Sequence, residues 1–160
     1  GSWFTSVIPH VLVPGLADGL KSSDARRALV LNLAAEPGET AGFSAERHIH
    51  VLAQHAPGLT VHDIIVDAAS VPSEREREQL RRTASLLEAS VNFAEVSRPG
   101  TPLHDPAKLA AALDAVRSRG EEASTITVPT AAPTSSETVL TPDRVRRSAG
   151  DGPRGDAPWR

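Results

Sequence analysis

Short apolar runs alternate with amphipathic stretches along the first 120 residues of the chain. The runs at 28–33, 60–67 and 90–96 have the length and the apolar content of β-strands and are bounded by turn-forming residues. The third run alternates apolar and polar positions, so we expect it near an edge of the sheet. Strands that alternate with helical segments are typical of a parallel sheet, and the pattern therefore predicts an α/β fold.

Two helical segments are predicted before the second strand. The first covers residues 5–21 and is interrupted, because Pro14 lacks a backbone donor and disfavours helical geometry at the residue before it. The second begins after Ser44, whose hydroxyl can cap it, and its buried side is formed by Ile49, Leu52, Ala53 and Ala56.

Two further helices follow the second and third strands. Ser73 and Glu76 have the spacing of a capping box, which predicts the start of a helix at this point. Asp105 and Pro106 supply an N-cap and a first-turn proline for the last helix. Gly120 is predicted to end that helix in the left-handed conformation.

The composition of the chain changes near residue 120. Residues 121–160 are rich in serine, threonine and proline and contain no long apolar stretch, so we predict a disordered tail after a domain at 1–120. Residue 1 is not methionine, and the predicted fold begins with a helix that no strand precedes. We therefore expect residues 1–120 to be the C-terminal part of a larger domain.

Composition and charge exclude several classes of function. The chain has no cysteine, which excludes disulfides and thiolate metal sites. The net charge is −3 and aromatic residues make up 3%, so nothing favours a nucleic-acid partner. No apolar run approaches the ~20 residues that span a bilayer. We expect a cytoplasmic protein without a membrane span.

Small and hydroxyl-bearing residues precede the first predicted helix. The free N–H groups of a first helical turn bind anions, and the hydroxyls of Ser2, Thr5 and Ser6 next to Gly1 can add donors to phosphate oxygens. The alternative is an ordinary N-cap or, for Gly1 and Ser2, a cloning scar. Both interpretations remain open from the residues alone.

A long polar loop at 32–44 follows the first predicted strand. Ligands of open α/β sheets bind outside the carboxyl ends of the strands, which is where this loop begins. Asn32 can present both a donor and an acceptor to a ligand there. The alternative is a simple connection that needs Gly38 and Gly42 for its backbone angles.

The six histidines do not form a recognisable zinc pair. His48 and His50 face different sides of a helix, and His48 and His55 lie two turns apart. We interpret them as solvated or capping residues and expect no metal site. His104 differs, because it lies in a loop after the third strand, next to Asp105, the predicted cap of the last helix. From this loop His104 can point into the same crevice as Asn32.

Asp67 ends the second predicted strand and offers a carboxylate at the same edge of the sheet. It can hold a metal-bound phosphate or cap the turn that follows, and the second role is the commoner one. No nucleophile elbow, Walker loop or complete glycine-rich dinucleotide motif is present in the sequence. The residues thus give no evidence of a catalytic centre.

Three segments of the chain resemble signatures of the gluconeogenesis factor family. Residues 1–10 (GSWFTSVIPH) resemble the first, residues 32–44 with their PGETAGFS match the second closely, and residues 104–109 (HDPAKL) resemble the third. The likeness is to mycobacterial-type members, which also carry a Ser/Thr/Pro-rich tail. That family is similar in fold to the phospholactate transferase CofD, which implies a Rossmann-like parallel sheet.

The resemblance implies a regulator rather than an enzyme. It would need no cofactor, would bind UDP-N-acetylglucosamine, and would link carbon metabolism to peptidoglycan precursor supply and cell shape. Glucosamine-6-phosphate synthase is the implied protein partner, and we expect a homo-oligomer. By match to the motifs, the diphosphate region, the adjoining loop and the closing residues would be Gly1, Ser2, Thr5, Ser6, Asn32, Gly38, Glu39, Thr40, His104 and Asp105.

Two alternatives accompany this reading of the family. The first is a CofD-like enzyme that transfers a phospho-group from a nucleotide-linked donor. The second concerns the tail, where Thr138 and Thr141 are candidate sites for a Ser/Thr kinase, the other interpretation being a tail that only increases solubility. The chain also departs from the family pattern, because His10 replaces a common asparagine, Leu103 replaces a common arginine, and the family's N-terminal half is absent.

Overall fold

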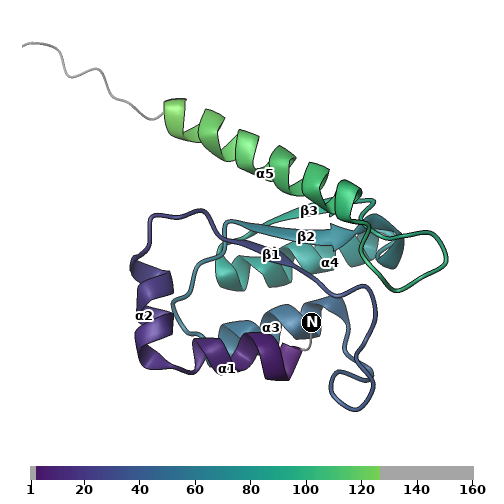
Figure 1. Ribbon diagram of the computed structural model, residues 1–160, viewed down its shortest axis with the longest axis horizontal. Helices are drawn as coiled ribbons and strands as arrows, with labels where there is room; N and C mark the ends of the chain where they lie inside the picture. Colours follow the sequence, from purple (N-terminus) through teal and green to yellow (C-terminus); the bar gives the residue numbers. More distant parts are fainter. Residues whose placement is uncertain (1–2, 127–160) are drawn as a thin grey trace, which may run out of the picture. The chain divides into compact units, whose positions relative to one another are not determined.

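A three-stranded parallel sheet forms the centre of the computed structural model, which describes residues 3–126 (Figure 1). Strands β1 (Ala28–Val30), β2 (Asp63–Asp67) and β3 (Ser90–Ala94) lie in the order β1-β2-β3 and are all parallel. The predicted parallel α/β fold is therefore confirmed, as is the position of the third strand at an edge.

All three strands are shorter than the runs that predict them. The ladder of β1 continues only as far as a hydrogen bond from the Leu31 N–H to the Ile65 carbonyl, at 3.0 Å. β2 begins at Asp63 rather than at residue 60, because both oxygens of Thr60 accept hydrogen bonds from the guanidinium of Arg27. These polar contacts occupy the Thr60 carbonyl before the strand begins.

The two faces of β2 are buried under different helices. Ile64 and Val66 belong to the larger core, which packs under α3 (Ala45–His55) and α4 (Glu74–Ala84). Ile65 belongs to a smaller core with Val116 of α5, which spans Pro106–Ile126. Figure 1 shows α5 on one side of the sheet and α3 and α4 on the other. All five residues of β2 are buried, as a central strand requires.

The N-terminal segment is helical and interrupted where the sequence predicts. A π-helical turn at Trp3–Val7 leads into α1 (Ile8–Val11), and α2 (Pro14–Ser22) begins at the proline itself. Val13 has a ψ of 113°, which is extended geometry, so Pro14 breaks the helix rather than only bending it.

The predicted caps of α3 and α4 are both present. The Ser44 hydroxyl accepts from the Arg47 N–H at 3.3 Å, and Ser73 and Glu76 form a reciprocal capping box. Short 3₁₀ turns at Ala68–Ser70 and Ser85–Leu87 follow β2 and α4. Local side-chain chemistry therefore fixes where these two helices begin.

The prediction that Gly120 ends the last helix is wrong. α5 continues through Gly120 to Ile126, and this glycine has no left-handed φ. The Arg26 guanidinium packs on it so closely that a Cβ would lie 2.6 Å from Nη1. The Arg26 side chain, just before β1, therefore lies against α5 at this glycine. The disordered tail is predicted to begin at residue 121, but residues 121–126 form the end of α5. The rest of that predicted tail, residues 127–160, lies outside the described residues.

A buried carboxylate at the start of β2 binds Arg26, just before β1, and Asn92 in the middle of β3, and Asn92 connects it to α5. Asp63 is 2% exposed and accepts hydrogen bonds from Arg26 Nε at 2.9 Å and from Asn92 Nδ2 at 3.1 Å. Arg26 Nη2 also pairs with Asp63 Oδ2 at 2.7 Å. The side-chain oxygen Oδ1 of Asn92 in turn accepts a hydrogen bond from the Arg119 guanidinium of α5. This Asp63 network links elements that are far apart in the sequence.

Replacing Asp63 with alanine should destabilise the fold by roughly 2–3 kcal/mol, because Arg26 and Asn92 lose a charged acceptor in a largely buried place. Urea denaturation measures the change. Glu95→Ala is the matched control, since its pair with Lys108 is 3.7 Å long and the Glu95 side chain is 81% exposed. Equal losses in the two variants would contradict a special role for Asp63.

Candidate functional site

Two cavities lie at the carboxyl edge of the sheet, on either side of the loop that follows β1. We call them the α3-side cavity, of about 250 Å³, and the α5-side cavity, of about 420 Å³. Residues 32–35 line both of them. This is the edge where ligands bind in open α/β sheets, because the loops after parallel strands gather there.

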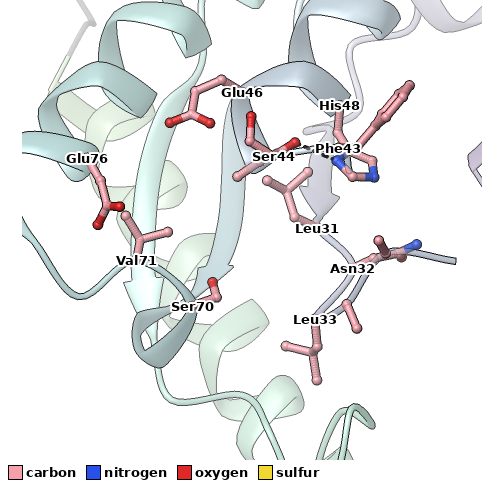
Figure 2. Close-up of a pocket in the computed structure, with 13 residues that line it drawn as sticks. Leu31, Asn32, Leu33, Phe43, Ser44, Glu46, His48, Ser70, Val71 and Glu76 are labelled. Atoms are coloured by element: carbon pink, nitrogen blue, oxygen red, sulfur yellow. Dashed lines mark hydrogen bonds between the residues drawn. The ribbon is translucent and has the colours of Figure 1, made fainter. Parts of the chain in front are cut away.

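The α3-side cavity is built by three segments that are distant in the sequence (Figure 2). The loop after β1 forms one wall, the start of α3 forms a second, and the turn after β2 with the start of α4 forms a third. Its lining residues are Leu31, Asn32, Leu33, Ala34, Ala35, Phe43, Ser44, Ala45, Glu46, His48, Ser70, Val71 and Glu76. The charged lining residues are both carboxylates, Glu46 and Glu76.

The α5-side cavity joins the two loops that the sequence predicts to meet. Residues 32–37 line one side, and Pro102, Leu103 and His104 line the other. The structure therefore brings Asn32 and His104 to one cavity. Their role as ligand-binding residues stays a prediction.

His48 is the residue that the sequence analysis places wrongly. It is only 5% exposed, so it is not a solvated histidine, and its ring contacts Trp3 and Phe43 edge to face. Its Nδ1 lies 2.8 Å from the Ser44 carbonyl oxygen. A carbonyl only accepts, so Nδ1 carries the proton. Nε2 is buried and has no hydrogen-bond partner among the described residues.

His104 and Asp105 have separate roles in the structure. Asp105 caps α5, since its Oδ1 accepts from the N–H groups of Ala107 at 2.9 Å and Lys108 at 3.1 Å. The cap predicted from the sequence is thus present. His104 pairs with Ser97 in an isolated antiparallel bridge, and its buried Nε2 has no hydrogen-bond partner within residues 3–126.

Gly38, Glu39 and Thr40 form a tight turn that the loop builds for itself. The Glu36 carbonyl accepts from the N–H groups of Glu39 and Thr40, and Gly38 has a φ of 79°, which favours glycine. The Thr40 side chain is fully buried, and its hydroxyl accepts from the Glu36 N–H at 2.7 Å. These three residues line neither cavity, and Thr40 shapes the loop that carries Asn32.

The π-helical turn at Trp3–Val7, which begins the first helix, lies against the start of α3. Phe4 and Phe43 meet edge to face with ring centroids 5.9 Å apart, and Trp3 and His48 do so at 5.2 Å. Thr5 and Ser6 are exposed in the π-helical turn between these contacts and α1. Gly1 and Ser2, and the tail residues Thr138 and Thr141, lie outside the described residues.

Asp67 has a structural role. It is 5% exposed, and its Oδ1 accepts from the N–H groups of Val96 at 2.9 Å and Ser97 at 3.2 Å. It therefore fixes the exit of β3 rather than the turn after its own strand. A third cavity of about 330 Å³ lies beside it, lined also by Glu95 and Lys108.

Most residues that line the α3-side cavity are not predicted from the sequence. Ser70, Glu46 and Glu76 line it, yet Glu76 is explained by its capping box and Ser70 by its turn. A signal was available for His48, since it comes four residues after the cap Ser44 and on the buried side of α3. Within residues 3–126, the His, Asp and Glu side chains form no cluster that could hold a metal ion.

Comparison with known proteins places this geometry in a family. The family model described as 2-phospho-L-lactate transferase CofD matches residues 1–103. A Mycobacterium tuberculosis protein named "Putative gluconeogenesis factor" is 66% identical over all 160 residues, and the chain covers 43% of that protein. The Mycobacterium leprae protein of the same name is 63% identical over 160 residues, and 45% of it is covered.

More distant relatives match shorter parts of the chain. The Bacillus subtilis protein named "Gluconeogenesis factor" is 31% identical over 78 residues, which are 49% of this chain and 25% of that protein. A crystal structure of a UPF0052 family member from Bacillus halodurans matches with a TM-score of 0.56 and 27% identity. The match covers 71% of this chain and 40% of the Bacillus halodurans chain. The chain thus spans less than half the length of these relatives.

The Asp105 cap predicts a pH-dependent contribution to stability. The Lys108 N–H, together with that of Ala107, lowers the pKa of Asp105 below its ordinary value of 3.8. A lowered folded-state pKa contributes stability that is present above the unfolded value and lost as the pH falls through the folded one. Asp105→Asn keeps a capping oxygen without the charge. Wild type should therefore have the higher urea midpoint above pH 4, and the difference should shrink below it; a constant difference would contradict this role.

Proposed function

The chain belongs to the CofD family and to its gluconeogenesis factors, and from that premise we propose that it binds the nucleotide sugar UDP-N-acetylglucosamine at the carboxyl edge of the sheet. In this proposal the protein is a regulator that senses the nucleotide sugar and requires no further cofactor. The loop at residues 32–37 would contact the ligand from the middle of the site.

The observation that carries the proposal is the pair of buried imidazole nitrogens beside this loop. His48 lines one cavity and His104 the other, and the buried Nε2 atom of each has no hydrogen-bond partner among the described residues. Buried polar atoms in folded proteins are nearly always paired, so such atoms mark places where a ligand or water binds. Two of them flanking Asn32 support one extended site.

The start of the first helix supports a place for the diphosphate. The aromatic contacts of Trp3 and Phe4 hold this start against the end of the 32–44 loop. Thr5 and Ser6 are exposed there, and the hydroxyls of these two first-turn residues can donate hydrogen bonds to phosphate oxygens. Gly1 and Ser2 would complete this part of the site.

The biological role follows from the ligand. A sensor of this precursor would link carbon metabolism to peptidoglycan supply and cell shape, and we propose glucosamine-6-phosphate synthase as the partner. Within the described residues, no helix is long and apolar enough to cross a bilayer. We place the protein in the cytoplasm, where nucleotide sugars are made, as a homo-oligomer whose tail a kinase modifies at Thr138 or Thr141.

A second candidate is a transferase that moves a phospho-group from a nucleotide-linked donor. The description of the matching family model favours it. Against it stands the lack, in residues 3–126, of a clustered set of acidic or imidazole groups of the kind that holds a metal-bound phosphate. Turnover of the donor separates the two candidates.

Isothermal titration calorimetry of the full-length protein with UDP-N-acetylglucosamine should give a saturable heat. Asn32→Ala should weaken binding about tenfold, because one ligand hydrogen bond is lost. Gln54→Ala is the matched control, since this amide is exposed on α3 and lines neither cavity. Absence of both heat and a thermal shift would overturn the proposal, and donor turnover that Asn32→Ala abolishes would favour the transferase.

A further inference from the structure

We propose that the α3-side cavity is the sugar subsite, in which His48 Nε2 accepts a hydrogen bond from a hydroxyl of the hexose. This inference rests on the proposed function. It assigns the hexose of the ligand to the α3-side cavity and the rest of the ligand to the neighbouring regions. It starts from the protonation of His48, the charge of the cavity and its size.

The tautomer of His48 is fixed by its own helix. Nδ1 lies 2.8 Å from the Ser44 carbonyl, which accepts the Nδ1 proton. In the neutral form of this tautomer Nε2 presents a lone pair, so this atom needs a donor. In Figure 2, Nε2 lies on the side of the ring away from Ser44 and toward Asn32. A hydroxyl supplies a donor there, whereas a phosphate oxygen ionised at neutral pH does not.

The charge of the cavity disfavours an anion and favours several hydroxyls. Its charged lining residues are Glu46 and Glu76, and among residues 3–126 no lysine or arginine lines it. A phosphate would be repelled by two carboxylates that nothing in the lining neutralises. Ionised carboxylates only accept hydrogen bonds, and Oε2 of Glu76 already accepts from Ser73. The lining therefore adds the Glu46 carboxylate and Oε1 of Glu76 to His48 Nε2 as acceptors. A hexose carries enough hydroxyl donors to serve them.

The size of the cavity fits one ring rather than a whole nucleotide sugar. Its volume of about 250 Å³ lies below the range of about 300–1,000 Å³ that holds drug-sized ligands. The uridine and diphosphate must then lie outside it, toward the helix start and the α5-side cavity. The ring of His48 is held by edge contacts with Trp3 and Phe43, so its acceptor is rigidly placed.

Helix α3 supplies a matched control for His48. Nδ1 of His55 makes the same contact with the carbonyl four residues earlier, Val51, also at 2.8 Å. His55 is exposed and lines neither cavity. A change at His55 therefore removes the same contact to the helix backbone without removing an acceptor from the site.

The test compares His48→Phe, His48→Gln and His55→Phe in the full-length protein, with UDP-N-acetylglucosamine and UDP as separate titrants. His48→Phe should bind the sugar nucleotide about tenfold more weakly, because it lacks the acceptor, and should bind UDP as wild type does. His48→Gln can return an oxygen to the place of Nε2 and should recover most of the affinity. His55→Phe should match wild type with both titrants.

A direct readout is the ¹⁵N chemical shift of His48 Nε2 in the wild-type protein, which does not depend on any variant folding. It should move on addition of UDP-N-acetylglucosamine and stay in place on addition of UDP. Wild-type binding with no loss in His48→Phe, an equal loss for both titrants, or a shift that UDP also causes would overturn the sugar subsite alone. A wild-type protein that binds neither titrant would overturn the proposed function as well.

Discussion

Two buried aspartates at the ends of the central strand hold this structure together. Asp63 at the amino end of β2 accepts from Arg26 and Asn92, which adjoin the other two strands. Asp67 at the carboxyl end accepts from the backbone N–H groups that follow β3. Both side chains lie on the face of the sheet that α5 covers, where Ile65 between them is the apolar contact. A buried carboxylate is stable only when it is well paired. Each aspartate therefore requires its hydrogen-bond partners to stay in position, and these contacts hold the neighbouring strands in place.

The geometry of the site follows from this arrangement of strands. Because the strands are parallel, the loops after β1 and β2 and the start of α5 come to one edge, and the loop after β1 has a cavity on each side. The α3-side cavity is acidic, while the start of the first helix, with its hydroxyls, lies beyond Phe43. A ligand with a neutral sugar and an anionic diphosphate matches these two regions in polarity.

His48 and His55 illustrate how position decides the chemistry of a side chain. Both stand on α3, and Nδ1 of each lies 2.8 Å from the carbonyl of the residue four positions earlier. Only His48 is covered by Trp3 and Phe43, so only its Nε2 is withdrawn from water. The same residue type on the same helix is therefore solvated at one position and an unsatisfied buried acceptor at the other.

The sequence by itself determined the features that depend on neighbours along the chain. The strands, the break at Pro14, and the caps Ser44, Ser73 and Asp105 are set by apolar periodicity and by side chains that bond to N–H groups two or three residues away. The loop containing Asn32 was also identified, because a polar loop after a buried strand has a known place in α/β sheets.

The tertiary structure alone decided what depends on contacts between distant segments. Gly120 looked like a helix end, but it lies inside α5, where Arg26, 94 positions earlier, packs on it. Asp67 binds the backbone after a different strand, and the acceptor of His48 became significant only when Trp3 and Phe43 covered its ring. The spacing of residues along the chain does not predict contacts between distant segments, because burial and hydrogen bonding between them arise only when the segments pack together.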